Sequence, residues 1–102
     1  MKKFLGFALL ALVFTACEPG IEGNGNVKEE TRESAPFDKI DVSGSFDIFL
    51  TPGNYTSVQV VTDENLLEHI ETYVKGGTLY VEAKEKLGHY QKLELVLTMK
   101  TF

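Results

Sequence analysis

Residues 40–50 read IDVSGSFDIFL, and their pattern is the clearest sign of how this chain folds. Apolar side chains recur there at every second position, and a glycine takes the one missing place: Ile40, Val42, Gly44, Phe46, Ile48 and Leu50. The positions between them carry polar side chains and one aromatic: Asp41, Ser43, Ser45, Asp47 and Phe49. An alternation with a period of two predicts a strand with one buried face, and the glycine indicates a bulge or a bend. Residues 51–54, TPGN, predict the turn that ends this strand.

Similar patterns continue to the end of the chain. Residues 57–62 are rich in Val and Thr, and residues 78–84 and 92–100 place aliphatic side chains on alternate positions. Between them, Asp63 can cap a short helix that carries Leu66, Leu67 and Ile70 on one face. Gly76 and Gly77 indicate a tight turn. The chain is therefore predicted to be mostly β, with about five short strands and one brief helix, and a sandwich, a barrel and a solenoid all remain open.

The N-terminus has the pattern of a secretory signal. Lys2 and Lys3 precede the uncharged apolar residues 4–14, and small residues follow before Cys17. As a helix, this apolar run would span roughly 16 Å, about half of a bilayer's hydrocarbon core, so a transmembrane span is not expected. The chain contains one cysteine. Residues 14–17, FTAC, resemble the bacterial lipobox, which implies cleavage before Cys17 and lipid attachment to it; the alternative is an ordinary signal with an incidental cysteine.

These features divide the chain into three parts. Residues 1–16 are the predicted lipoprotein signal peptide, residues 17–33 a lipid-anchored flexible tether rich in Gly and Asn, and residues 34–102 the β domain. Within the tether, residues 27–33 could also form a short edge strand. Loss of the two signal lysines would move the net charge from −5 to about −7. This acidity argues against nucleic acid as a partner, because phosphate binding needs clustered Lys and Arg.

Residues typical of catalysis or metal binding are sparse. His69 and His89 belong to no metal-binding motif, and Asp38, Asp41 and Asp47 do not form a calcium loop. No catalytic residue, metal ligand or cofactor site is therefore predicted, and Cys17 is the one predicted site of modification. Four aromatics fall on polar positions or in turns: Phe49, Tyr55, Tyr80 and Tyr90. Such side chains can contact sugars or proteins, but the preferred interpretation is that the second face of the sheet is partly covered by the tether, the helix or the missing rungs.

The segments 25–27 and 37–48, with the turn at 51–54, the strand at 58–62 and the segments 63–67 and 76–81, resemble one known family. It is DUF2807, the "putative auto-transporter adhesin, head GIN domain", and the likeness covers about residues 24–84. The resemblance implies an exported, lipid-anchored protein of Bacteroidetes-type bacteria. It also implies a right-handed β-helix-like fold, whose later part consists of repeated strand-turn rungs. Because those rungs are missing and the last apolar strand ends near Phe102, residues 34–102 are expected to be the N-terminal part of such a domain, a fragment.

Together these features predict a non-catalytic lipoprotein of the cell envelope, most simply of the outer membrane, on its periplasmic or surface face. Its predicted role is adhesion or surface binding, with a glycan or a surface protein as ligand. Two alternatives stay open: a polysaccharide-active envelope enzyme of the β-helical type, and a structural envelope lipoprotein without a ligand. The oligomeric state cannot be read from the sequence.

Overall fold

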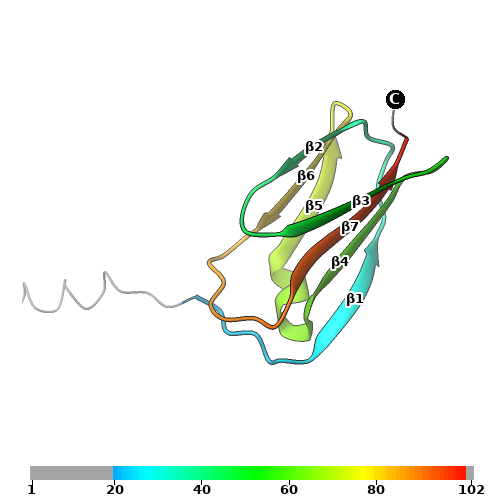
Figure 1. Ribbon diagram of the computed structural model, residues 1–102. Coiled ribbons are helices and arrows are strands. Elements are labelled where there is room, and N and C mark those ends of the chain that lie inside the picture. The colour runs from blue at the N-terminus through cyan, green and yellow to red at the C-terminus, as the bar shows by residue number, and fades with distance from the viewer. Residues whose placement is uncertain (1–19, 101–102) are drawn as a thin grey trace, which may run out of the picture.

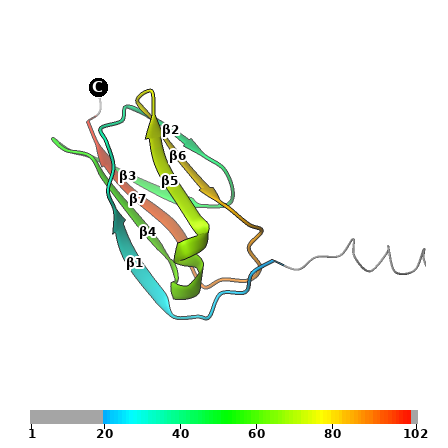
Figure 2. The same ribbon diagram turned by 180° about the vertical axis from the view of Figure 1, so that it is seen from behind.

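The computed structural model describes residues 20–100, which form two β-sheets that pack face to face (Figures 1 and 2). The four-stranded sheet has the order β1 (Val27–Arg32), β4 (Ser57–Asp63), β7 (Leu93–Met99), β3 (Asp47–Pro52). The three-stranded sheet has the order β2 (Lys39–Val42), β6 (Thr78–Ala83), β5 (Ile70–Lys75). One short 3-10 helix, η1 (Glu64–His69), joins β4 to β5. The prediction of a mostly β chain with one brief helix is confirmed.

The predicted signal peptide, residues 1–16, and Cys17 lie outside the described residues. Among residues 20–100, no helix is both long and apolar enough to span a membrane.

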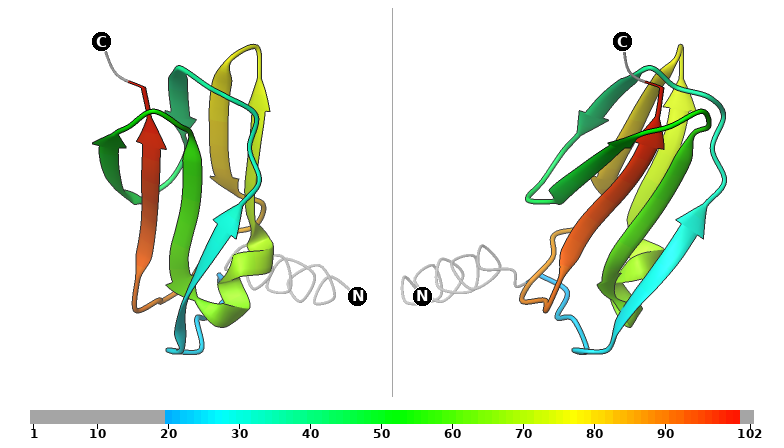
Figure 3. Two further views of the ribbon diagram at one scale, coloured as in Figure 1. Left: turned by 90° about the vertical axis from the view of Figure 1, so that its right-hand side faces the viewer. Right: turned by 45° about the vertical axis from the view of Figure 1, so that its right-hand side comes forward.

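Both sheets are mixed, and each contains one parallel pair. Strand β2 pairs in parallel with β6, so that Ile40 lies opposite Leu79. Strand β3 pairs in parallel with β7, so that Ile48 lies opposite Leu95. The pairs β1–β4, β4–β7 and β5–β6 are antiparallel. The segments β2–β3 and β6–β7 therefore each cross from one sheet to the other, and they run side by side (Figure 3).

The hydrophobic core lies between the sheets and follows the predicted alternation. In β7, the side chains at every second position are buried, whereas those between them are half-buried on the outer face. The opposite wall comes from β6 and from the start of β5. The buried apolar residues of this cluster are Phe37, Val58, Val60, Ile70, Leu79, Val81, Leu93, Leu95, Leu97 and Met99. Because apolar burial dominates folding free energy, these strands hold the two sheets together.

Residues 40–50 differ from the single strand that their alternation predicts. They form two strands in different sheets, because the chain turns the corner between the sheets at residues 43–46. Gly44 has a φ of +112°, a conformation that disfavours any side chain, so the bend predicted at this glycine is confirmed. Ile48 and Leu50 keep the inward phase beside buried neighbours of β7, yet they remain 47% and 48% exposed, since β3 is an edge strand.

Asp63 does not act as the predicted helix cap. Its side chain makes no capping hydrogen bond to η1 and is 1% exposed. Its carboxylate instead accepts hydrogen bonds from the backbone amides of Gly25, Gln91 and Lys92, at 3.0, 2.9 and 3.3 Å. Buried carboxylates are tolerated when such donors replace water, and here they connect three segments of the chain.

Within the predicted tether, residues 17–33, the described residues 20–32 are attached to the domain in the structure. Residues 27–32 form the edge strand β1, one of the two predicted alternatives, which pairs with β4 along its whole length. The Arg32 guanidinium donates to the carbonyls of Leu67 and Ile70, both at 2.8 Å, and so ties β1 to the start of the other sheet. Residues 20–26 also hydrogen-bond to the domain, because their glycines allow the backbone to approach closely.

The pair Leu50 and Leu97, which lie opposite each other in register, tests this description of the core. Leu97→Ala removes a fully buried side chain and is expected to lower the free energy of unfolding by about 2–5 kcal/mol. Leu50→Ala removes a half-exposed side chain and should cost only about 1 kcal/mol. Urea unfolding of the two variants measures the difference, and equal losses would contradict an open edge at β3.

Candidate functional site

A cleft of about 650 Å³ opens at the end of the sandwich where β1, β3 and β7 finish and β4 and β6 begin. We call it the distal cleft, because the chain enters the domain near Gly20 at the opposite end (Figure 1). Four segments that are far apart in the sequence surround it. Its lining residues are Pro36, Phe37, Asp38, Asn54, Tyr55, Thr56, Gly77 and Lys100.

One wall is positioned by the turn between β5 and β6. Gly76 and Gly77 have φ values of +60° and +79°, which L-residues rarely adopt, so this tight turn depends on glycine. The carbonyl of Gly77 accepts hydrogen bonds from the amides of Asp38 and Lys39, at 2.9 and 3.2 Å. A Cβ at Gly77 would lie 3.2 Å from the Asp38 carboxylate. The turn therefore fixes the segment that carries Asp38 and Phe37.

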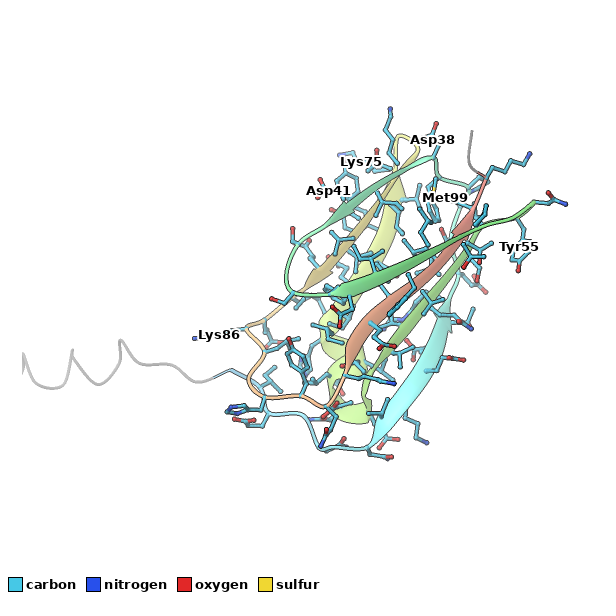
Figure 4. The ribbon with its side chains drawn as sticks, viewed as in Figure 1. Asp38, Asp41, Tyr55, Lys75, Lys86 and Met99 are labelled. Atoms are coloured by element: carbon cyan, nitrogen blue, oxygen red, sulfur yellow. The ribbon has the colours of Figure 1, made fainter. Side chains whose placement is uncertain are left out.

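The other wall is the turn between β3 and β4. The Gly53 amide donates to the Met99 carbonyl at 3.0 Å, which anchors the turn to the end of β7. A Cβ at Gly53 would lie 2.7 Å from the Thr98 side chain, so the two strands approach too closely for a larger residue. This turn presents Asn54 and Tyr55, and Tyr55 projects from the domain with 65% of its surface exposed (Figure 4).

The side chains in the distal cleft suit reversible binding. Phe37 is buried at its base, and Tyr55 offers an aromatic ring at its rim. Asp38, Asn54 and Lys100 supply hydrogen-bonding groups of three kinds, an acceptor, an amide and a cation. Pockets for small ligands combine an apolar lining with a few polar groups in this way. Asp38 is the one carboxylate among the lining residues, whereas glycoside hydrolysis generally uses a pair.

A second aromatic group lies on the outer face of the three-stranded sheet. Tyr73 and Tyr80 are opposite each other in register, and their rings stack with centroids 5.1 Å apart and an interplanar angle of 18°. Asp41 of β2 lies next to Tyr80 in the same row. Because the rings face each other, the pair stabilises the sheet by cross-strand packing more directly than it offers a flat binding platform.

The ordinary pKa of Tyr73 is raised in this environment. Partial burial of the phenol is the largest cause, and the negative charges of Glu82 and Glu71 follow. Tyr80 and Asp41 add smaller contributions in the same direction. A phenolate at Tyr73 would be partly desolvated and would be repelled by the neighbouring carboxylates, so the neutral phenol is favoured.

The other residues singled out in the sequence do not join the distal cleft. Phe49 lies exposed on β3, Tyr90 lies exposed at the opposite end, and Tyr80 is in the stacked pair. His69 contacts Glu85 at 2.6 Å and His89 contacts Glu22 at 3.4 Å, so both take part in polar contacts at the domain surface. Asp38, Asp41 and Asp47 do not form a cluster that could hold a metal ion, and residues 20–100 contain no group of three potential metal ligands.

Of the cleft residues, only Tyr55 and Asp38 are weighed as functional candidates on the sequence alone. Asn54 belongs to the predicted turn at 51–54, and Lys100 ends the predicted strand at 92–100. Tyr73 was also missed as an exposed aromatic, although its position two residues before Lys75 fits the outward phase of β5. Its exposure could have been predicted once β5 was known to begin at Ile70.

Comparisons with known proteins agree with this fold. A family model described as "Putative auto-transporter adhesin, head GIN domain" (DUF2807) matches residues 36–102. A search of curated proteins finds no match.

Several solved structures are similar. One is described as a "putative lipid binding protein" from Parabacteroides distasonis, with 26% identity and a TM-score of 0.70 over 80% of this chain and 37% of that one. Two are described as a "putative adhesin". The Parabacteroides merdae protein has 21% identity and a TM-score of 0.72, over 81% of this chain and 35% of that one. The Bacteroides fragilis protein has 23% identity and a TM-score of 0.72, over 81% of this chain and 40% of that one. The chain thus spans well under half the length of each.

The raised pKa of Tyr73 gives a direct test of the outer sheet face. Glu82→Gln is expected to lower the Tyr73 pKa toward its ordinary value of 10.0, because it removes the charge with the largest effect on Tyr73 while keeping the side-chain shape. Since the folded state holds this proton more tightly, the associated stability is complete below 10.0 and is lost as the pH rises through the higher folded pKa. The NMR shift of the Tyr73 ring carbon follows the titration. Glu94→Gln, on the other sheet, is the control and should leave it unchanged; an equal response to both variants would contradict the assigned cause.

Proposed function

The chain belongs to the family described as "putative auto-transporter adhesin, head GIN domain", and on this premise we propose that it is a lipid-anchored, non-catalytic binding module of the bacterial cell envelope. Membership in an adhesin-like family supports an envelope or surface location. The outer membrane is the proposed site of anchoring, through lipid on Cys17. The observation that carries the binding role is the distal cleft, which opens at the end of the domain opposite the point where the anchored segment enters.

The proposed ligand of the distal cleft is a sugar residue of a surface glycan. A ring such as that of Tyr55 can stack on the apolar face of a sugar, while Asp38 and Asn54 can bond its hydroxyl groups. The size of the cleft is in the range of small-ligand pockets. A lone carboxylate favours binding over glycoside hydrolysis, which generally uses a pair.

The β-helix-like architecture remains part of this proposal. It is supported by the two segments β2–β3 and β6–β7, which both cross from one sheet to the other. They pair in parallel in each sheet, β2 with β6 and β3 with β7. Parallel pairing of successive crossings is the repeating element of a β-solenoid.

The anchor is tested by metabolic labelling with a radioactive fatty acid in a bacterial host that processes lipoproteins. The parent chain is expected to incorporate label and to fractionate with membranes, because two or more acyl chains give stable anchoring. Cys17→Ser should lose both properties. A parent chain that is secreted without label would contradict the proposal and support an ordinary signal with an incidental cysteine.

The role of the distal cleft is tested on a panel of immobilised glycans, followed by titration of the best ligand. Tyr55→Ala is expected to weaken binding about tenfold or more, which corresponds to about 1.4 kcal/mol for the lost ring contact. Tyr90→Ala removes an exposed tyrosine at the other end of the domain and serves as the matched control. Equal affinities for the parent and for Tyr55→Ala would show that the distal cleft is not the binding site. If the domain binds a free lipid but no glycan on the panel, a lipid replaces the glycan as the proposed ligand.

A further inference from the structure

Residues 20–26 are fastened to the domain by their own backbone. The Ile21 amide donates to the Lys86 carbonyl at 2.9 Å, and the Gly88 amide donates back to the Ile21 carbonyl at 2.7 Å. Two residues later, the Gly23 amide donates to the His89 carbonyl at 2.8 Å. Ile21 thus adds a short parallel bridge to the connection between β6 and β7. We call residues 20–26 the clamp.

The clamp and this connection share a buried carboxylate. One oxygen of Asp63 accepts the Gly25 amide, and the other accepts the amides of Gln91 and Lys92. Hydrogen bonds to an acceptor sequestered from water are strong and costly to lose. Gly23 packs so closely that a Cβ there would lie 2.1 Å from an Asp63 oxygen. The glycines of the clamp therefore allow close contact, and the segment is held in place.

Side-chain amides extend the same attachment. The Asn65 side chain donates to the Glu22 carbonyl at 2.7 Å and accepts the Asn24 amide at 2.8 Å. The Glu64 amide donates to the Asn26 carbonyl at 2.8 Å, immediately before β1 begins. Every part of the clamp from Ile21 to Asn26 is consequently bonded to the body of the domain.

The clamp leaves little chain between the domain and Cys17. Two residues, Glu18 and Pro19, separate Cys17 from Gly20, and these three steps along the chain reach at most about 10–11 Å when extended. If residues 17–33 were all free, the reach would be roughly 55–60 Å. Strand β7 alone spans about 23 Å, so the free part is shorter than the domain that it holds.

We propose that the clamp fixes the orientation of the domain on the membrane. The end formed by the clamp and residues 84–92 faces the bilayer surface, and the distal cleft points away from it. This inference rests on the proposed lipid on Cys17, and it adds that the domain is held close and in one direction instead of moving freely on a long tether.

Energy transfer from the domain to the membrane tests the orientation. Lys86 lies beside the clamp and Lys75 lies beside the turn at the distal end (Figure 4). A fluorophore is attached to Lys86→Cys or to Lys75→Cys in lipidated protein, in which the Cys17 sulfur is blocked by the thioether-linked diacylglyceryl group. The protein is placed in phosphatidylethanolamine–phosphatidylglycerol vesicles that contain an acceptor-labelled lipid. Transfer from position 86 is expected to be several-fold more efficient than from position 75, and equal transfer would overturn the proposal.

Two further variants separate the clamp from the anchor. A flexible insertion of about ten Gly and Ser residues after Pro19 lengthens the free chain and keeps the clamp, so the two transfer efficiencies should converge. Asn65→Ala removes two hydrogen bonds of the clamp and should reduce their difference. A difference that survives the insertion would show that something other than the short connection orients the domain, which overturns the inference.

A failure of lipidation would be seen separately, because the parent protein would not float with the vesicles. In that case hydrogen exchange on the soluble chain still tests the clamp. The amides of Ile21, Gly23 and Gly25 should exchange orders of magnitude more slowly than in a free peptide. Free exchange at these amides would overturn the clamp itself, whatever the fate of Cys17.

Discussion

Strand β7 pairs on both of its edges, and this double pairing holds the four-stranded sheet and the core together. Strand β7 lies antiparallel to β4 and parallel to β3, so it satisfies two rows of backbone hydrogen-bonding groups at once. Its inward face consists of Leu93, Leu95, Leu97 and Met99, which form the centre of the core. Without β7, β3 would have no hydrogen-bonded neighbour among the described strands, and β4 would lose its neighbour on one side. Strand β7 thus joins segments that lie much earlier in the sequence.

The sequence predicted strand positions better than strand partners. Alternation located β7 and the inward residues of β6, because a strand with one buried face leaves a period of two in the chain. The same period could not show that residues 40–50 divide between two sheets, since the inward phase continues through the corner at Gly44. Parallel pairing leaves no local pattern either, because it joins segments that are 39 residues apart for β2 and β6 and 47 residues apart for β3 and β7. The distal cleft could not be predicted for a related reason: its walls come from four separate turns and strand ends.

The N-terminal segment shows how one composition can have two opposite consequences. Glycine and asparagine usually indicate a flexible linker, because glycine loses the most entropy on ordering and asparagine favours turns. In this chain the glycines let the backbone lie against Asp63, and Asn65 provides both a donor and an acceptor for it. The partners lie about forty residues away, so composition alone does not reveal that the cost of ordering is offset. A single buried acid, Asp63, whose place in the sequence predicts a helix cap, determines the outcome.

The two edge strands of the four-stranded sheet, β1 and β3, differ in the side chains that they leave exposed. Strand β1 is exposed but strongly polar, and its Arg32 reaches across to the other sheet. Strand β3, in contrast, exposes three consecutive apolar residues, Ile48, Phe49 and Leu50, and two of them have the inward phase of the core. An edge of this kind is a template for further pairing, and a charged edge is not. Because apolar burial scales with the area removed from water, an additional strand would gain more beside β3 than beside β1, since both a backbone edge and core-facing side chains are exposed at β3. The hydrophobic interior of the sandwich is therefore closed at β1 by an arginine and left open at β3.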